Sequence, residues 1–198
     1  MSEVVKESLP EALIKIQKYL DKIMLKKDKP VLLAIDGKSG SGKTTLAEEL
    51  ARQYQAELYH MDDFFLQPFQ RTLERLAEIG GNVDYKRFQE EVLLPILENR
   101  EFSYGIFNCK EQKIIEYKRA ARAKLHIIEG AYSAHPYFGN PYDFIVCLDI
   151  DKEIQKERIR VRNGEGMVKR FVEEWIPKEN AYLEKFHIME LANLCIQV

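Results

Sequence analysis

An eight-residue segment in the first quarter of the chain has the residue types and spacing needed to bind a nucleoside triphosphate. Residues 37–44 read GKSGSGKT and fit the pattern G-x-x-x-x-G-K-[ST]. The glycines let the backbone curl so that successive N–H groups point at phosphate oxygens, and a following helix adds partial positive charge. In this pattern Lys43 reaches the β- and γ-phosphates, and the hydroxyl of Thr44 is a ligand for Mg²⁺. The segment therefore predicts a nucleotide site.

The predicted nucleotide-binding residues are Gly37, Lys38, Ser39, Gly40, Ser41, Gly42, Lys43, Thr44 and Thr45, the last of which we expect mainly to support the start of the helix. A chance glycine-rich turn is the alternative. It is disfavoured because an apolar run precedes the motif and a helical pattern follows it, in the order that this phosphate-binding loop requires. The motif does not distinguish phosphoryl transfer from a conformational switch or mechanical work.

Two acidic positions have the chemistry to complete a site for phosphoryl transfer. Asp62 follows a short strand-like segment, and a carboxylate at the carboxyl end of a strand can accept the proton of an attacking hydroxyl. Glu129 ends an apolar run, where a charge is costly unless a cation or hydrogen-bond donors meet it. We predict that Asp62 is a catalytic base and that Glu129 contacts Mg²⁺ through a water. The alternatives are a turn or helix cap for Asp62 and a capping or ion-paired role for Glu129.

Two arginines late in the chain are candidates for stabilising the transferred phosphoryl group. Arg158 and Arg162 are four residues apart, so on a helix both point to the same side. Guanidinium groups are suited to the charge that spreads over phosphate oxygens during transfer. A solvated helix face is the alternative, because lysines, glutamates and a third arginine crowd the same segment.

These side chains need a framework of buried strands that end beside the nucleotide loop. Apolar runs typical of such strands lie at residues 31–35, 58–60, 125–128, 144–150 and 194–198, the last as an edge strand. Helical spacing of apolar residues occurs at 9–27, 44–55, 71–79 and 85–97, and residues 102–117 suggest a small hairpin. Strands that alternate with helices predict an α/β P-loop NTPase fold, a doubly wound parallel sheet of about five strands with helices on both faces.

The chain of 198 residues has the length of one domain, and we expect a single domain over 1–198. Within it we expect an N-terminal helix in 1–29, a substrate-binding excursion in 64–120 and a lid in 152–172. The net charge of -2 gives no electrostatic case for nucleic acid or an anionic membrane as partner. No signal peptide or membrane-length apolar stretch is apparent, and the three cysteines form no metal-ligand spacing. We predict a cytoplasmic protein with a small-molecule partner; a homo-oligomer is compatible with the sequence.

Several segments besides the nucleotide loop occur in the order found in one known family. They are HMDDFF at 60–65, GNVDY at 81–85, IIEGAY at 127–132 and the arginine-bearing stretch 158–162. From Val31 onward the chain resembles the uridine kinase and phosphoribulokinase group of P-loop kinases. The resemblance implies ATP and Mg²⁺ as cofactors, and it supports the roles given above to Asp62 and Glu129. It also implies that Arg158 and Arg162 are lid arginines.

The resemblance also implies two substrate contacts. Asp84 matches the family aspartate that binds hydroxyls of the acceptor sugar, with a plain helix N-cap as the alternative, and Asp62 would touch the same acceptor. Tyr104 falls in a segment that forms a wall for the nucleobase in uridine kinases. Uridine kinases carry a histidine and then an arginine close to this wall, whereas this chain has Cys109, Lys110 and Glu111.

We therefore expect an ATP-dependent kinase that phosphorylates a hydroxyl of a small molecule, with a nucleoside as the leading acceptor. Pantothenate, a ribosylated cofactor precursor and a phosphosugar are other acceptors of the same class. A nucleotide-dependent switch or binding protein is the rival class. A switch does not require Asp62, and the chain has no N-K-x-D segment of the kind that reads guanine in such proteins.

Overall fold

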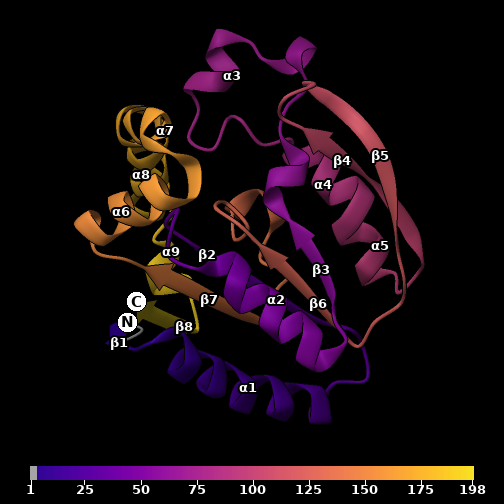
Figure 1. The fold of residues 1–198 in the computed structure, drawn as a ribbon. Coiled ribbons are helices and arrows are strands. Elements are labelled where there is room, and N and C mark those ends of the chain that lie inside the picture. Colours follow the sequence, from indigo (N-terminus) through magenta and orange to yellow (C-terminus); the bar gives the residue numbers. More distant parts are fainter. Residues whose placement is uncertain (1–3) are drawn as a thin grey trace.

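A six-stranded parallel sheet forms the centre of the protein. In the computed structural model, which describes residues 4–198, the strand order is β1-β8-β7-β2-β6-β3 (Figure 1). The strands are β1 (Val4–Lys6), β2 (Val31–Gly37), β3 (Glu57–His60), β6 (Leu125–Glu129), β7 (Phe144–Asp149) and β8 (Leu194–Gln197). Every neighbouring pair is parallel, which confirms the predicted α/β class. Because β2 lies between β6 and β7, the loop that follows it starts near the middle of the carboxyl edge of the sheet.

The sheet has one strand more than expected, and this strand changes the edge. β8 was predicted as the edge strand, but β1 pairs with it on its outer side, from Val4 opposite Cys195 to Lys6 opposite Gln197. Residues 1–29 therefore contain a short strand before the predicted helix. A strand of three residues ending in a lysine carries too little apolar pattern to be recognised from sequence.

Two helices cover one face of the sheet. α1 (Leu9–Lys26) begins at a capping box formed by Ser8 and Glu11, and α2 (Lys43–Tyr54) begins at the end of the glycine-rich loop. They pack against the sheet through buried side chains that recur at helical spacing, Ala12, Ile16 and Leu20 from α1 and Leu46, Ala47 and Leu50 from α2. This packing fixes the start of α2, and with it the loop, against β2.

The opposite face is covered by the C-terminal helices and by the excursion. α4 (Tyr85–Phe88), a π-helical turn (Gln89–Leu93) and α5 (Leu94–Leu97) form the predicted helix over 85–97, and β4 (Phe102–Asn108) and β5 (Lys113–Ala120) form the predicted hairpin. α3 (Leu73–Ala77) is shorter than predicted because Thr72 caps it and Glu78 is extended. In Figure 1 α3 lies at the top and the hairpin to the right.

The last third of the chain supplies the other side of the carboxyl edge. α6 (Lys152–Asn163) and α7 (Glu165–Arg170) occupy the segment predicted as a lid. A π-helical turn (Phe171–Trp175) leads into α8 (Ile176–Lys185), and α9 (Ile188–Leu191) precedes β8. Figure 1 shows α6, α7 and α8 on the side away from the hairpin. No helix in residues 4–198 is long and apolar enough to span a membrane.

Candidate functional site

The glycine-rich loop connects β2 to α2 as predicted, and its backbone requires glycine where the chain turns. Gly37 has φ +128°, and a Cβ there would lie 2.0 Å from the carbonyl oxygen of Leu148. Gly42, with φ 96°, caps the N-terminus of α2. Lys43 is buried, and its Nζ donates to the carbonyl oxygens of Gly37 and Lys38, each at 2.9 Å. The ammonium group is thus held across the loop, where phosphate oxygens would bind.

Thr44 and Glu129 meet at this loop although 85 residues separate them. Thr44 Oγ1 lies 3.3 Å from both carboxylate oxygens of Glu129, which is 5% exposed. His60 Nδ1 lies 2.5 Å from Glu129 Oε1, and this bond raises the pKa of His60. A hydroxyl beside a carboxylate fits Mg²⁺, which takes one or two protein oxygens plus phosphate and water. Residues 4–198 contain no cluster of three or more His, Cys, Asp or Glu side chains arranged to hold a metal.

Asp62 lies in the 3₁₀ turn Met61–Phe64 that directly follows β3. Its side chain is exposed, but protein atoms around it weaken its hydration. This desolvation, and then the charge of Glu129, raises its pKa, whereas Lys43 and Arg162 act in the opposite direction. His60, two residues before Asp62, pairs with Glu129 across β3 and β6, and Thr44 beside Lys43 contacts Glu129, so these predicted site residues lie at one carboxyl edge of the sheet.

The two predicted lid arginines are both on α6, and both are exposed. Arg158 Nη1 donates to the carbonyl oxygen of Gly40 in the loop, at 3.2 Å. The guanidinium carbon of Arg162 lies 5.8 Å from the centre of the Phe171 ring, and its charge lowers the pKa of Asp62. Thr45 is also exposed, on the first turn of α2.

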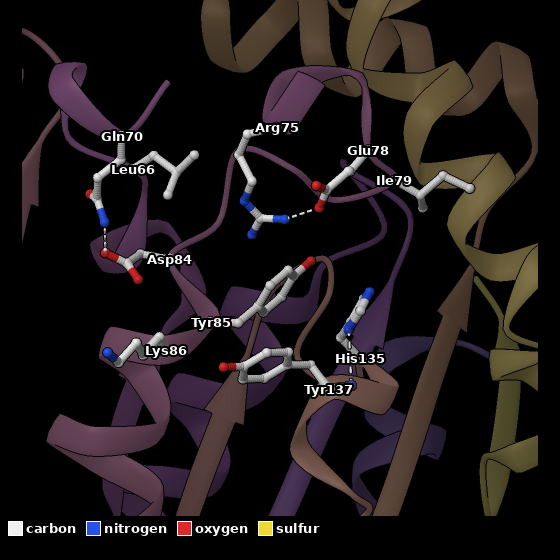
Figure 2. Close-up of a pocket in the computed structure, with 10 residues that line it drawn as sticks. All are labelled: Leu66, Gln70, Arg75, Glu78, Ile79, Asp84, Tyr85, Lys86, His135 and Tyr137. Carbon is white, nitrogen blue, oxygen red and sulfur yellow. Dashed lines mark hydrogen bonds and ion pairs between the residues drawn. The ribbon is translucent and has the colours of Figure 1, made fainter. Parts of the chain in front are cut away.

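A pocket of about 470 Å³ opens between the excursion and the loop that follows β6 (Figure 2). Asp84 and Tyr85, at the start of α4, form part of its wall, Arg75 from α3 lies opposite, and His135 and Tyr137 come from the loop after β6. The His135 and Tyr85 rings stack at 4.4 Å between centroids. Burial lowers the pKa of His135 to about 4, so its ring is neutral at neutral pH. The pocket therefore combines aromatic surfaces with charged groups, the carboxylates of Asp84 and Glu78 and the cations of Arg75 and Lys86.

Asp84 is both a helix cap and a pocket residue. Its Oδ1 accepts a hydrogen bond from the backbone N–H of Arg87 at 3.1 Å, so the helix-cap interpretation is correct. Its Oδ2 accepts from Nε2 of Gln70 at 2.7 Å, and the side chain lines the pocket. Because each carboxylate oxygen has more than one acceptor site, capping leaves capacity to bind a ligand.

Tyr104 does not line this pocket, and the expectation that it forms a ligand wall is wrong for this structure. It is 1% exposed and packs inside the core, with its ring 5.3 Å from Tyr59 and 5.8 Å from Phe64. The alternation of β4 predicts a strand, but it does not tell which face the excursion will cover. Tyr104 lies on the covered face.

The comparisons with known proteins agree with this geometry. The sequence model for the shikimate kinase family, described as "Shikimate kinase", matches residues 39–107. A uridine kinase of Brevibacillus brevis is 44% identical over 148 residues, which cover 69% of this chain and 67% of that protein. This chain belongs to the uridine kinase-like family of P-loop kinases.

Solved structures share the fold of this uridine kinase-like protein. A possible uridine kinase from Bacillus stearothermophilus superimposes with a TM-score of 0.68, at 18% identity, over 92% of this chain and 99% of that one. D-glycerate 3-kinase from Cryptococcus neoformans superimposes with a TM-score of 0.66, at 13% identity, over 89% and 88% of the two chains. Because kinases with differently named substrates share this fold, the fold leaves the acceptor open.

Sequence reasoning missed a buried carboxylate directly before the P-loop of this uridine kinase-like protein. Asp36 is 0% exposed and accepts three hydrogen bonds, from the N–H groups of Gly37 (2.6 Å) and Ala134 (2.8 Å) and from the hydroxyl of Tyr182 (2.7 Å). Burial raises its pKa in spite of these donors. It joins the P-loop to the loop after β6 and to α8. The available signal was a charge within the apolar run VLLAIDG.

A second buried carboxylate, Glu179 on α8, was also missed. Its Oε2 accepts the backbone N–H of Ser39 at 2.9 Å, and its Oε1 accepts the hydroxyl of the same serine. Gln155 of α6 donates to the carbonyl oxygen of Ser39 at 2.9 Å. Helices α6 and α8 thus contact the P-loop at Ser39 from outside. Nothing in the local sequence pattern of α8 indicates this contact.

Proposed function

We propose that this uridine kinase-like protein transfers the γ-phosphate of ATP, with Mg²⁺, to a hydroxyl group of a nucleoside. The observation that carries the proposal is the register of the sheet. β2 and β3 both pair with β6, so the P-loop after β2 and the turn of Asp62 after β3 flank Glu129 at the end of β6, and Glu129 contacts Thr44 beside Lys43. A lysine for phosphate, an oxygen ligand for Mg²⁺ and a free carboxylate are the set that a P-loop kinase needs. A switch has no need of the carboxylate at Asp62.

On the donor side, the P-loop amides and Lys43 would bind the β- and γ-phosphates. Thr44 and Glu129 would hold Mg²⁺, directly and through water respectively. When bound, Mg²⁺ neutralises charge that develops on the phosphate oxygens. Arg158 already contacts the P-loop at Gly40, which suits a residue that stabilises the transferred group.

On the acceptor side, the hydroxyl oxygen forms a bond to the γ-phosphorus while the bond from that phosphorus to the β–γ bridging oxygen breaks. The proton of the hydroxyl passes to the Asp62 carboxylate, and ADP leaves. Asp84 would accept hydrogen bonds from hydroxyls of the sugar. The rings of Tyr85, His135 and Tyr137 would lie against a planar base, and a neutral His135 suits an uncharged one.

An acceptor screen tests the proposal. Purified protein with ATP and Mg²⁺ is incubated with nucleosides, pantothenate, ribosylated pyridines and phosphosugars, and the masses of the products are measured by mass spectrometry. We expect a gain of one phosphoryl group on a nucleoside. A gain on another acceptor instead would keep the kinase and correct the substrate. ATP hydrolysis without any phosphorylated acceptor across the panel would count against phosphoryl transfer and in favour of a switch.

Asp62→Asn tests the base directly. We expect kcat for the acceptor to fall by roughly 10²-fold or more, with the Kd for ATP unchanged, because the amide cannot take the proton. Asp63→Asn is the matched control, since it removes the neighbouring carboxylate and should leave most of the turnover. Equal activity of Asp62→Asn and wild type would place the base elsewhere.

A further inference from the structure

We infer that Arg87 is a positioning residue, which holds the main chain beside the catalytic base and so fixes Asp62 relative to the acceptor-binding carboxylate Asp84. The inference deepens the proposed function and rests on it. Arg87 lies on α4, three residues after Asp84, and is 9% exposed. Buried arginines are rare unless they are paired, so this side chain calls for a specific role.

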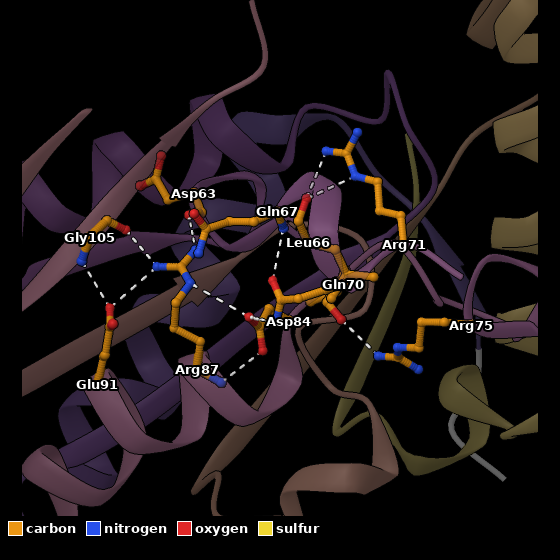
Figure 3. Close-up of polar contacts among 11 residues, drawn as sticks. Asp63, Leu66, Gln67, Gln70, Arg71, Arg75, Asp84, Arg87, Glu91 and Gly105 are labelled. Atoms are coloured by element: carbon orange, nitrogen blue, oxygen red, sulfur yellow. Dashed lines mark hydrogen bonds and ion pairs between the residues drawn. The ribbon is translucent and has the colours of Figure 1, made fainter. Parts of the chain in front are cut away.

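Three arginines of this region donate to main-chain carbonyl oxygens, as Figure 3 shows. Arg71 donates to Leu66 through Nε (2.9 Å) and Nη2 (2.7 Å), and Arg75 donates to Val83 (2.8 Å). Arg87 differs in its target. Its Nη2 donates to the carbonyl oxygen of Asp63 at 2.5 Å, in the 3₁₀ turn that carries Asp62. Of these three arginines, it is Arg87 that binds the turn that carries Asp62.

The other end of the guanidinium group is anchored to the hairpin. Arg87 Nη1 donates to the carbonyl oxygen of Gly105 in β4 at 2.8 Å, and Glu91 Oε2 accepts the N–H of the same glycine at 2.9 Å. Arg87 and Glu91 also face each other at 3.3 Å. The hairpin packs closely here, because a Cβ at position 105 would lie 2.8 Å from Ile114 Cγ2 and the Ile114 side chain would have to shift. The peptide at Gly105 is thus clamped on both sides and gives the arginine a fixed support.

Two carboxylates compensate the charge of Arg87, although its Nε is buried without a hydrogen-bond partner among the described residues. Besides Glu91, the Asp84 carboxylate lies 4.0 Å from Arg87 Nε. The guanidinium carbon lies 4.3 Å from the centre of the Phe64 ring, a cation–π geometry that again involves the turn of the base. An ammonium group could supply the charge but not this planar set of contacts.

The first turn of α4 therefore holds two successive carbonyl groups of the catalytic turn. Arg87 takes that of Asp63, and the backbone N–H of Asp84 donates to that of Phe64 at 2.7 Å. The turn that carries the base and the carboxylate proposed to bind the acceptor are consequently parts of one rigid unit. Transfer requires reacting atoms about 3–3.5 Å apart, and a misplacement of about 1 Å can reduce the rate by about 10²-fold. Arg87 thus acts on turnover through Asp62.

Arg87→Lys tests the inference, because lysine keeps the charge and loses the two directed bonds. We expect kcat to fall by roughly 10²-fold, with the Kd for ATP unchanged and the KM for the acceptor changed far less than kcat. Arg71→Lys is the matched control, since it alters a carbonyl-binding arginine of the same excursion that does not reach Asp63; it should keep most of the wild-type kcat. In Arg87→Ala, added guanidinium ion at millimolar concentration should restore part of the lost rate.

The outcomes separate the inference from the function on which it rests. Wild-type turnover in Arg87→Lys would overturn the role of Arg87 and leave the kinase intact. A parallel loss of ATP binding and kcat, with no rescue by guanidinium, would show a merely structural residue and would also overturn it. If wild type phosphorylates no acceptor of the panel, the proposed function fails, and the inference fails with it.

Discussion

Replacing Tyr182 by phenylalanine removes one hydroxyl from a buried carboxylate and leaves the surrounding rings in place. The hydroxyl donates to Asp36 Oδ2 at 2.7 Å, while the ring packs on His135 and Tyr132. Asp36 keeps the N–H groups of Gly37 and Ala134 as donors. A hydrogen bond to a charged group contributes about 1.5–3 kcal/mol, so we expect the free energy of unfolding to fall by about this amount at pH values where Asp36 is ionised.

The loss should depend on pH because it concerns a charged acceptor. Burial already raises the folded-state pKa of Asp36 above its ordinary value of 3.8, and loss of the Tyr182 donor raises it further. A raised folded-state pKa means that this carboxylate favours the folded protein at low pH and disfavours it as pH rises through that pKa. Because the unfolded state is the same in both proteins, the variant's deficit is full above the raised pKa of Asp36 in the variant and shrinks as pH falls through that pKa toward the lower folded-state pKa of the wild type.

Urea unfolding at a series of pH values from about 9 to about 4 measures this deficit across the titration of Asp36. Tyr142→Phe is the matched control, because its hydroxyl donates at 2.5 Å to a neutral acceptor, the carbonyl oxygen of Ser133. Its deficit should be about 0.5–1.5 kcal/mol and nearly constant with pH. A deficit for Tyr182→Phe below that of the control, or one that does not change with pH, would refute the charge-assisted contact.

Two further predictions concern the donor side. Lys43→Ala should lower kcat by about 10³-fold and greatly weaken ATP binding, because it removes the cation beside the transferred phosphoryl group. Calorimetric titration with ATP and a product assay check this, and full activity would contradict the P-loop assignment. Glu129→Gln should raise the Mg²⁺ concentration needed for half-maximal rate by roughly 10–100-fold, because it removes the carboxylate that would orient the water bound to the ion. A Mg²⁺ titration at saturating ATP measures the shift. An unchanged titration would leave Glu129 with a structural role only.

The donor side was predictable from the sequence because its pattern is local. Strand, glycine loop, Lys43, Thr44 and helix follow one another within 31–54, and each local preference agrees with the others. The placement of Asp62 just after one strand and of Glu129 at the end of another was also predictable, because carboxyl ends of parallel strands share one edge. The edge strand β1 was not predicted, because it is short and its pairing partner β8 lies at the other end of the chain.

The contacts that hold the P-loop from outside and set the covered face of the excursion were not predictable in the same way, because they join residues distant in sequence. Asp36 meets Ala134 and Tyr182 at separations of 98 and 146 residues, and Glu179 meets Ser39 at 140. Tyr104 was misplaced for the same reason, since only the packing of the excursion shows which side of β4 is covered. Patterns of period 2 or 3.6 indicate a buried face but do not name its partner.

These distant contacts link the two halves of the site into one arrangement. α8 binds the P-loop through Glu179 and reaches Asp36 through Tyr182, and the Tyr182 ring lies parallel to His135 at an angle of 8°. His135 in turn stacks on Tyr85 in the pocket wall. Packed rings and buried hydrogen bonds thus form a continuous path of contacts from the P-loop to the surface that would receive the acceptor. Selection of the acceptor should accordingly depend on α8 as well as on the excursion.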